Sequence, residues 1–150
     1  MDKDEEKDVP SSASWQVPEI RWRTVWLGYL IGLLSTLVIG LPFLLIMKRS
    51  WLMALAGSIG LLVGSLVVGR RVTRSTAVVN GALMAILYNL SIALFYFIGS
   101  FLEVFPEPLP GLPQGDSTFF FAWPLAQFVI GILGAIIGSR FLAKRLRRAD

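Results

Sequence analysis

The sequence predicts an all-α integral membrane protein, a four-helix bundle with both termini in the cytoplasm. Four apolar stretches of spanning length indicate the helices, over residues 24–47, 51–69, 77–102 and 119–141. A hydrocarbon core of about 30 Å requires about 20 residues at helical rise, and each stretch meets that requirement. The composition agrees, since 55% of the residues are hydrophobic and the mean hydropathy is +0.67, well above the values of a water-soluble domain.

Local signals predict where these helices begin and end. The first three stretches contain no charged residue, and the fourth contains only Arg140 beside its end. Thr76 can cap the third helix at its N-terminus. Pro42 in the first stretch removes a backbone hydrogen bond and predicts a kink. Pro124 suits a first helical turn, so the fourth helix is expected to begin near Trp123.

The segments outside the spans are expected to be tails. Residues 1–19 predict a disordered acidic tail, because five acidic residues and two lysines occupy the first ten positions. A secretory signal peptide has the opposite order, first basic and then apolar, so the first span is expected to remain as a signal anchor. Residues 20–142 are predicted to form the four-span domain, and residues 143–150 a basic cytoplasmic tail.

The distribution of basic residues predicts the orientation, because the cytoplasmic ends of spans collect lysine and arginine. Ten basic residues fall at ends that a four-span chain places on one side, against only Lys48 and Arg49 on the other. The ten are Arg21, Arg23, Arg70, Arg71, Arg74, Arg140, Lys144, Arg145, Arg147 and Arg148. Both termini are therefore expected in the cytoplasm, and the expected location is the plasma membrane of a prokaryote.

Tryptophans near the ends of the spans follow the same division. Trp22 and Trp26 lie at the inner end of the first span, and Trp51 and Trp123 lie at the outer ends of the second and fourth. Amphipathic rings favour the headgroup level, so these residues are interpreted as depth anchors. Stacking of an aromatic ligand is the alternative interpretation of the pattern.

Small residues recur every four positions in each span, as in a glycine zipper. They are Gly28, Gly32, Thr36 and Gly40 in the first span, Ala56, Gly60 and Gly64 in the second, Gly81, Ala85, Asn89 and Ala93 in the third, and Gly131, Ala135 and Ser139 in the fourth, which also has Gly134 and Gly138. Residues four apart share one helix face, and a face without bulk lets helices approach closely in lipid. The stripes are predicted to pack helices, either within one bundle or, for at least one stripe, in a homo-oligomer or larger membrane complex.

The second and fourth spans share a longer pattern that is consistent with an internal duplication. Residues 57–65 and 131–139 both read G-x-x-G-x-x-x-G-S, both run inward, and both are followed by arginine. Two related hairpins of the same orientation would form a parallel repeat about an axis along the membrane normal. Shared packing pressure on the few residue types that transmembrane helices use is the alternative explanation.

Asn89 is the most unusual residue inside the predicted spans, because it falls near the middle of the third. Its depth matches that of Ser35 and Thr36 in the first span, which crosses in the same direction. An amide in hydrocarbon needs partners, so Asn89 is expected to donate to Ser35, to Thr36 or to a carbonyl beside them. Such a bond would join helices, contributing about 0.6 kcal/mol, or would mark a polar station on a permeation path.

The residue types argue against most catalytic and metal-binding chemistry. The chain has no cysteine and no histidine, so the usual ligands of zinc, copper, haem and iron–sulfur clusters are missing. No ionisable residue lies at mid-span, which disfavours proton-coupled transport. The acidic residues of the outer loop, Glu103, Glu107 and Asp116, are too sparse for a calcium site. The sequence therefore predicts no enzyme activity and no cofactor.

Membrane lipids are the expected partners of the basic residues at the inner ends of the spans. The candidates for headgroup contact are Arg70, Arg71, Arg74, Arg140, Lys144 and Arg145. Anionic lipid attracts each such charge with about 1 kcal/mol. Nucleic acid is not a predicted partner, because these charges sit against the membrane.

The stretch from Gly60 to Gly81 resembles small four-span membrane proteins of the YrzE-like kind. It contains a glycine-rich second span, a short basic loop and a glycine that opens the third span. The repeated glycines of the fourth span fit the same outline, so the resemblance covers residues 20–142. It implies the four-span topology and assigns no activity to any residue. The small-residue faces and the missing chemistry predict a non-enzymatic structural or accessory protein that packs with itself or a membrane partner. A small channel or facilitator for a neutral or small solute is the alternative.

Overall fold

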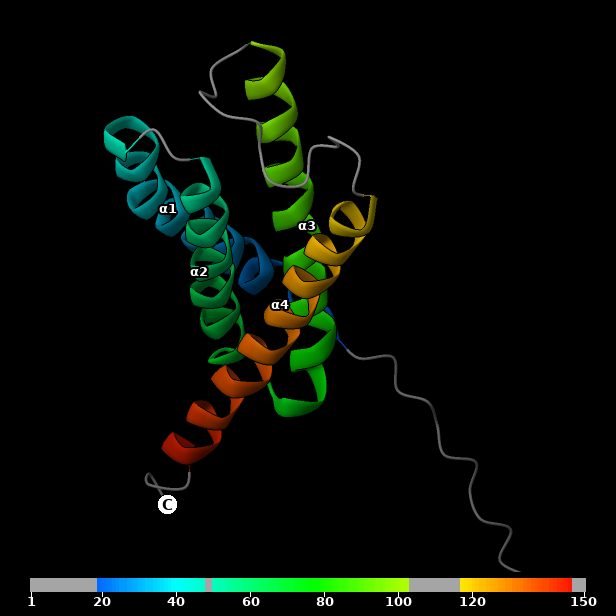
Figure 1. Cartoon of the computed structure of the whole chain (residues 1–150). Helices are drawn as coiled ribbons and strands as arrows, with labels where there is room; N and C mark the ends of the chain where they lie inside the picture. The colour runs from blue at the N-terminus through cyan, green and yellow to red at the C-terminus, as the bar shows by residue number, and fades with distance from the viewer. Residues whose placement is uncertain (1–18, 48–49, 103–116, 147–150) are drawn as a thin grey trace, which may run out of the picture.

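Four helices and no strand make up the part of the chain that the computed structural model describes, residues 19–47, 50–102 and 117–146 (Figure 1). They are α1 (Trp22–Met47), α2 (Ser50–Gly69), α3 (Arg74–Phe101) and α4 (Ser117–Leu146). The prediction of an all-α fold is confirmed. Most of both predicted tails and the outer loop with its acidic residues lie outside the described residues.

Three of the four helices are long and apolar enough to cross a membrane. The qualifying stretches are Trp22–Phe43 of α1, Arg74–Gly99 of α3 and Ala122–Phe141 of α4. The apolar stretch of α2, Ala54–Gly69, is shorter and does not qualify. The helices follow the four predicted spans in order, and each begins or ends within a few residues of the expected boundary.

The N-terminus of α3 differs from the sequence prediction. The helix begins at Arg74, and Thr73 precedes it. The Thr76 N–H donates to the Thr73 carbonyl at 3.1 Å, and the two hydroxyls are also 3.1 Å apart. The prediction that Thr76 caps this helix is therefore wrong, because the hydroxyl and carbonyl of Thr73 already serve the first turn.

The two prolines lie inside continuous helices. Pro42 falls within α1, which runs on to Met47. Pro124 falls within α4, which begins at Ser117, so the expectation that this helix begins near Trp123 is wrong. Each proline removes one backbone hydrogen bond, and its ring crowds the carbonyl four residues before it, but both helices continue through these positions.

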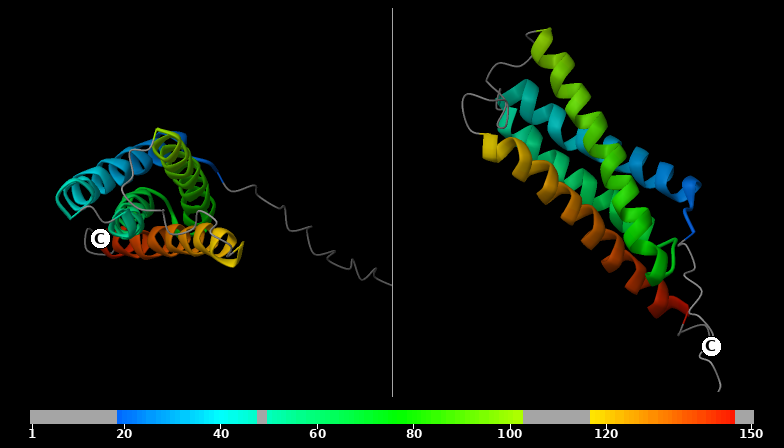
Figure 2. Two further views of the ribbon diagram at one scale, coloured as in Figure 1. Left: turned by 45° about the horizontal axis from the view of Figure 1, so that its top comes forward. Right: turned by 90° about the vertical axis from the view of Figure 1, so that its right-hand side faces the viewer.

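The shortest helix, α2, lies at the centre of the arrangement, where it contacts α1, α3 and α4. Helix α3 also contacts α1 and α4, whereas α1 and α4 do not meet within the described residues. Consecutive helices run antiparallel, so α1 and α3 point one way while α2 and α4 point the other (Figure 2). The entry to α1, the α2–α3 turn and the C-terminal part of α4 therefore meet at one end, held by contacts of Arg21 with Asn80 and of Arg70 with Phe141.

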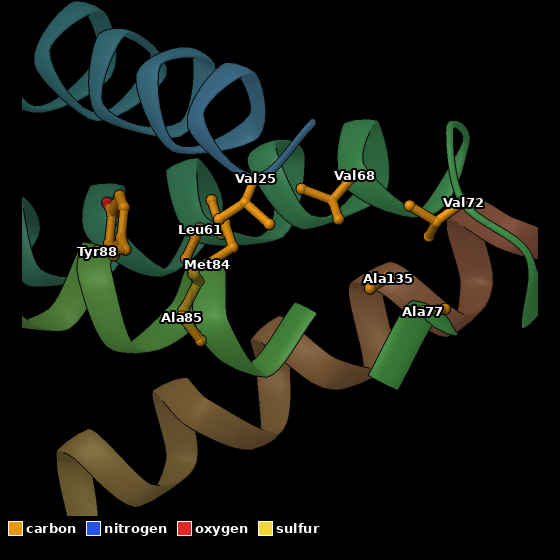
Figure 3. Close-up of a cluster of buried hydrophobic side chains, with 9 residues drawn as sticks. All are labelled: Val25, Leu61, Val68, Val72, Ala77, Met84, Ala85, Tyr88 and Ala135. Carbon is orange, nitrogen blue, oxygen red and sulfur yellow. The ribbon is translucent and has the colours of Figure 1, made fainter. Parts of the chain in front are cut away.

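We call this end the arginine end, after Arg21, Arg23, Arg70, Arg71, Arg74 and Arg140, all of which are exposed. The interior between the helices contains a cluster of buried apolar residues, Val25, Leu61, Val68, Val72, Ala77, Met84, Ala85, Tyr88 and Ala135 (Figure 3), and some buried polar ones. Many large apolar side chains instead point outward, including Leu34, Val38 and Leu94. This is the distribution expected where the outer surface of the helices meets lipid and small residues let the backbones approach.

The entry to α1 is held by a side chain of α3. The backbone N–H of Arg21 donates to the side-chain oxygen of Asn80 at 2.8 Å. The side-chain NH₂ of Asn80 donates to the backbone carbonyls of Glu19 at 3.1 Å and Thr76 at 2.8 Å. Asn80 is completely buried. One buried amide thus fixes where the first helix begins relative to the third.

Replacing Asn80 by leucine should lower the stability of the folded chain. The Arg21 N–H and the Glu19 carbonyl would lose their partner, at a cost of about 1–3 kcal/mol. Asn89→Leu is the matched control, because the Asn89 amide donates only to the Ala85 carbonyl of its own helix and is half-buried. Thermal unfolding in one neutral detergent should show a clearly larger loss for Asn80→Leu, and equal losses would contradict the role assigned to Asn80.

Candidate functional site

Helices α1 and α2 approach each other through their small-residue stripes. The predicted members Gly28, Gly32, Thr36, Gly40, Ala56, Gly60 and Gly64 are all buried. A Cβ atom on Gly60 would stand 2.5 Å from the Gly32 carbonyl oxygen, and one on Gly28 would stand 2.8 Å from the Gly64 carbonyl oxygen. Cβ atoms do not come that near to backbone, so a side chain at these positions would force the helices apart.

Helices α3 and α4 meet in the same way over a shorter length. A Cβ atom on Gly81 would stand 2.6 Å from the Ala135 Cβ and 3.1 Å from the Gly131 carbonyl oxygen. A Cβ atom on Gly131 would stand 2.5 Å from the Ala85 Cβ. The stripe of α3 then leaves the contact, since Asn89 is half-buried and the next member, at position 93, is exposed.

The second row of glycines in α4 faces α2. A Cβ atom on Gly134 would stand 2.7 Å from the Ser65 Cβ, and one on Gly138 would stand 3.0 Å from the Gly69 Cα. In the shared G-x-x-G-x-x-x-G-S pattern, these glycines correspond to Gly60 and Gly64, which face α1. The two copies of the pattern therefore serve different contacts, which favours packing pressure over duplication as the explanation of the pattern.

Apart from the outer end of the α3 stripe, the stripes are directed at neighbouring helices of the same chain. Each contact named above joins two helices of one copy, and the glycines that make it are buried there. For these glycines, packing within one chain is therefore the interpretation that the geometry favours.

Four polar side chains, one from each helix, make hydrogen bonds between helices, and we call these Thr36, Ser58, Tyr88 and Gln127 the polar layer. Tyr88 joins three helices, because its hydroxyl contacts the Thr36 hydroxyl of α1 and lies 2.8 Å from the Gly57 carbonyl of α2. The Thr36 hydroxyl also lies 2.9 Å from the Gly32 carbonyl. The hydroxyl groups of Thr36 and Tyr88 thus have two hydrogens between them for three contacts. Both residues are almost completely buried.

The other half of the polar layer joins α2 to α4. The Gln127 amide donates to the Ser58 hydroxyl at 2.8 Å, and that hydroxyl donates to the Ala54 carbonyl at 3.3 Å. Gln127 is 3% exposed, and its carbonyl oxygen has no hydrogen-bond partner. A buried acceptor without a donor costs about 1–3 kcal/mol. It is the one such side-chain atom among the described residues.

Asn89 does not belong to the polar layer, and the prediction that it donates to Ser35 or Thr36 is wrong. Its amide donates to the Ala85 carbonyl of its own helix at 2.9 Å. Tyr88 takes the place that faces Thr36, and because adjacent helical residues point about 100° apart, only one of the two can face α1. A tyrosine hydroxyl at mid-helix needs a hydrogen-bond partner as much as an amide does. This need was the feature of the sequence from which the contact of Tyr88 with Thr36 could have been predicted.

The predicted headgroup residues Arg70, Arg71, Arg74 and Arg140 lie exposed at the arginine end. The side chains of Lys144 and Arg145 lie outside the described residues, although both positions are helical. The Arg70 guanidinium lies 5.3 Å from the centre of the Phe141 ring of α4. A guanidinium nitrogen of Arg21 donates to the Arg71 carbonyl at 3.4 Å. The basic residues at the entry to α1 and in the α2–α3 turn are thus neighbours, and the turn contacts α4 through Phe141.

No family model, no curated protein and no solved structure matches the chain. The resemblance to small four-span membrane proteins therefore stays a prediction. The described residues contain no group of three His, Cys, Asp or Glu side chains that could hold a metal ion. The geometry offers two features for a functional argument, the helix contacts with their polar layer and the arginine end.

The close α1–α2 contact can be tested with two glycines of one helix. Gly60→Ala should lower the stability by about 1–3 kcal/mol, because its methyl group would meet the Gly32 backbone. Gly57→Ala is the matched control: Gly57 is also buried in α2, but a Cβ atom there would meet only the Tyr88 hydroxyl, at an ordinary 3.7 Å. Detergent unfolding curves should separate the two variants, and equal stability would contradict the contact.

Proposed function

We propose that the protein is a non-enzymatic integral membrane protein of four spans, with a structural or accessory role exercised through helix packing. The observation that carries the proposal is the radial distribution of residue size: small residues face the neighbouring helices and large apolar residues face outward. The outward residues include Leu30, Leu34, Val38, Leu45, Leu90, Leu125 and Leu133, each more than half exposed. Such a surface suits lipid and the helices of other membrane proteins.

The length of α2 supports a fourth span. The helix contains 20 residues, which at about 1.5 Å per residue reach about 30 Å, the thickness of a hydrocarbon core. Its contacts with the three other helices shield its polar backbone on most sides. Four spans and a single arginine end support a topology in which the entry to α1 and the end of α4 share the cytoplasmic side.

Cysteine labelling tests this topology. The chain has no cysteine of its own, so a thiol reagent reports only an introduced site. An impermeant maleimide should label Gln114→Cys in the outer loop of intact cells and should leave Ala149→Cys unlabelled. Both variants should react after permeabilisation. Labelling of Ala149→Cys alone in intact cells would reverse the proposed orientation.

The outer part of α3, residues 93–102, supports an accessory role. Positions 93, 94 and 95 are exposed in succession, and 97, 98, 101 and 102 are exposed on either side of the buried Gly99. Because three successive helical residues cover about 200° of the circumference, this part of α3 is open on several sides. It stands clear of the other helices at the top of Figure 1. A helix of a membrane partner could pack against these exposed side chains.

Photo-crosslinking distinguishes a partner from lipid on this surface. A benzophenone amino acid at Phe97, which is 68% exposed on α3, should capture a protein partner in native membranes. The same group at Leu34, which is 62% exposed on α1, is the matched control and should react with lipid alone. Protein adducts at neither position would argue that lipid covers α3 and would count against an accessory role.

The polar layer favours a second candidate function, a facilitator for a small neutral solute. It crosses all four helices, and the unpartnered Gln127 carbonyl oxygen could accept a hydrogen bond from a passing donor. Solute uptake into proteoliposomes, measured with water and glycerol, tests it. Uptake that depends on this protein and is changed by Gln127→Leu would place this function ahead of the first; uptake no faster than in empty vesicles would dismiss it.

A further inference from the structure

The arginine end brings together basic residues from two separate segments, the entry to α1 and the α2–α3 turn. Arg21, at the entry to α1, donates to the Arg71 carbonyl at 3.4 Å. Arg70, the preceding residue of the same turn, lies over Phe141 of α4. We call Arg21, Arg70 and Arg71 the arginine ribbon.

The charge of this ribbon is not balanced within the described part of the chain. The described residues have six arginine side chains at the arginine end and a single acidic residue, Glu19. Glu19 pairs with Arg21 at 3.7 Å, but both side chains are largely exposed, and exposed pairs of this kind contribute little. Arg70 is held by an aromatic ring, which leaves its charge uncompensated. Positive charges without acidic partners on one surface favour the binding of an anion.

Apolar groups beside the ribbon indicate what kind of anion would bind. Trp22, next to Arg21 in the chain, and Trp26, one turn further along α1, are 52% and 49% exposed, and Phe141 is 47% exposed beneath Arg70. A free anion would make no use of these surfaces, whereas a phospholipid would place acyl carbons against them. Guanidinium groups recognise phosphate through paired hydrogen bonds.

We infer that the arginine ribbon is a binding site for an anionic phospholipid, whose phosphate lies among Arg21, Arg70 and Arg71 and whose acyl chains lie on the exposed aromatic and apolar side chains nearby. The inference goes beyond the proposed function, because it requires a membrane but no protein partner. It holds whether or not the outer part of α3 captures another protein.

Native mass spectrometry of the full-length protein in a neutral detergent tests the site. Phosphatidylglycerol should bind with at least a tenfold lower dissociation constant than phosphatidylcholine with the same acyl chains. Glycerol phosphate, the soluble source of the same phosphate chemistry, should not displace it at equal concentration. Equal binding of the two lipids, or full displacement by glycerol phosphate, would overturn the inference.

Substitutions separate a defined site from diffuse charge attraction. Arg70→Gln and Arg21→Gln should each weaken phosphatidylglycerol binding about fivefold, which corresponds to about 1 kcal/mol per basic residue. Arg23→Gln removes the same charge at the same end but lies about 200° around α1 from Arg21, so its effect should be less than twofold. Arg70→Lys retains the charge without the fork of donors and should fall between Arg70→Gln and the native protein.

If all three glutamine variants weakened phosphatidylglycerol binding equally, the lipid would be attracted by the overall charge and not by a defined site. That result would overturn the inference. Thermal unfolding in detergent without lipid controls for folding, and each variant should unfold within a few degrees of the native protein. A variant that fails this control is replaced by the lysine variant at the same position, for which the same order of dissociation constants is expected.

Discussion

The close backbone contact between α1 and α2 is the constraint on which the other features depend. Gly60 lies against Gly32 with no room for a Cβ atom between them. Because α2 is also in contact with α3 and α4, its separation from α1 sets the distances across the whole arrangement. Tyr88 of α3 can reach both Thr36 and the Gly57 carbonyl only because these lie on helices that are already close together.

The polar layer combines packing and polarity in one place. Burying a hydroxyl or amide among apolar helices is unfavourable unless it is hydrogen-bonded, so Thr36, Ser58 and Tyr88 favour the single helix arrangement that pairs them. The Gln127 carbonyl oxygen departs from this pattern. As an unpaired buried acceptor, this oxygen makes the polar layer less stable. As a free acceptor, it could bind a solute, so Gln127 is the residue at which a packing role and a facilitator role differ.

The arginine end, which we propose lies on the cytoplasmic side, also holds separate segments of the chain together. Asn80 fixes the entry to α1 while Arg21 reaches the α2–α3 turn, so the basic groups of distant segments are held near one another. An orientation signal requires only that basic residues lie near the ends of the spans, and it would not require these contacts. Their presence turns scattered arginines into a surface with a defined shape, and the exposed aromatic residues beside it give that surface an apolar border.

The sequence by itself determined the four helices, their order, the buried stripes of small residues and the gathering of arginines near span ends, because apolar length, four-residue spacing and charge placement are local properties of the chain. Only the tertiary structure decided that Gly134 faces α2, that Tyr88 and not Asn89 meets Thr36, and that Asn80 holds the entry to α1. These outcomes depend on the rotation of each helix about its axis and on its choice of neighbour. Both are set by contacts between residues more than 50 positions apart, such as Thr36 with Tyr88 and Arg21 with Asn80, which no local pattern encodes.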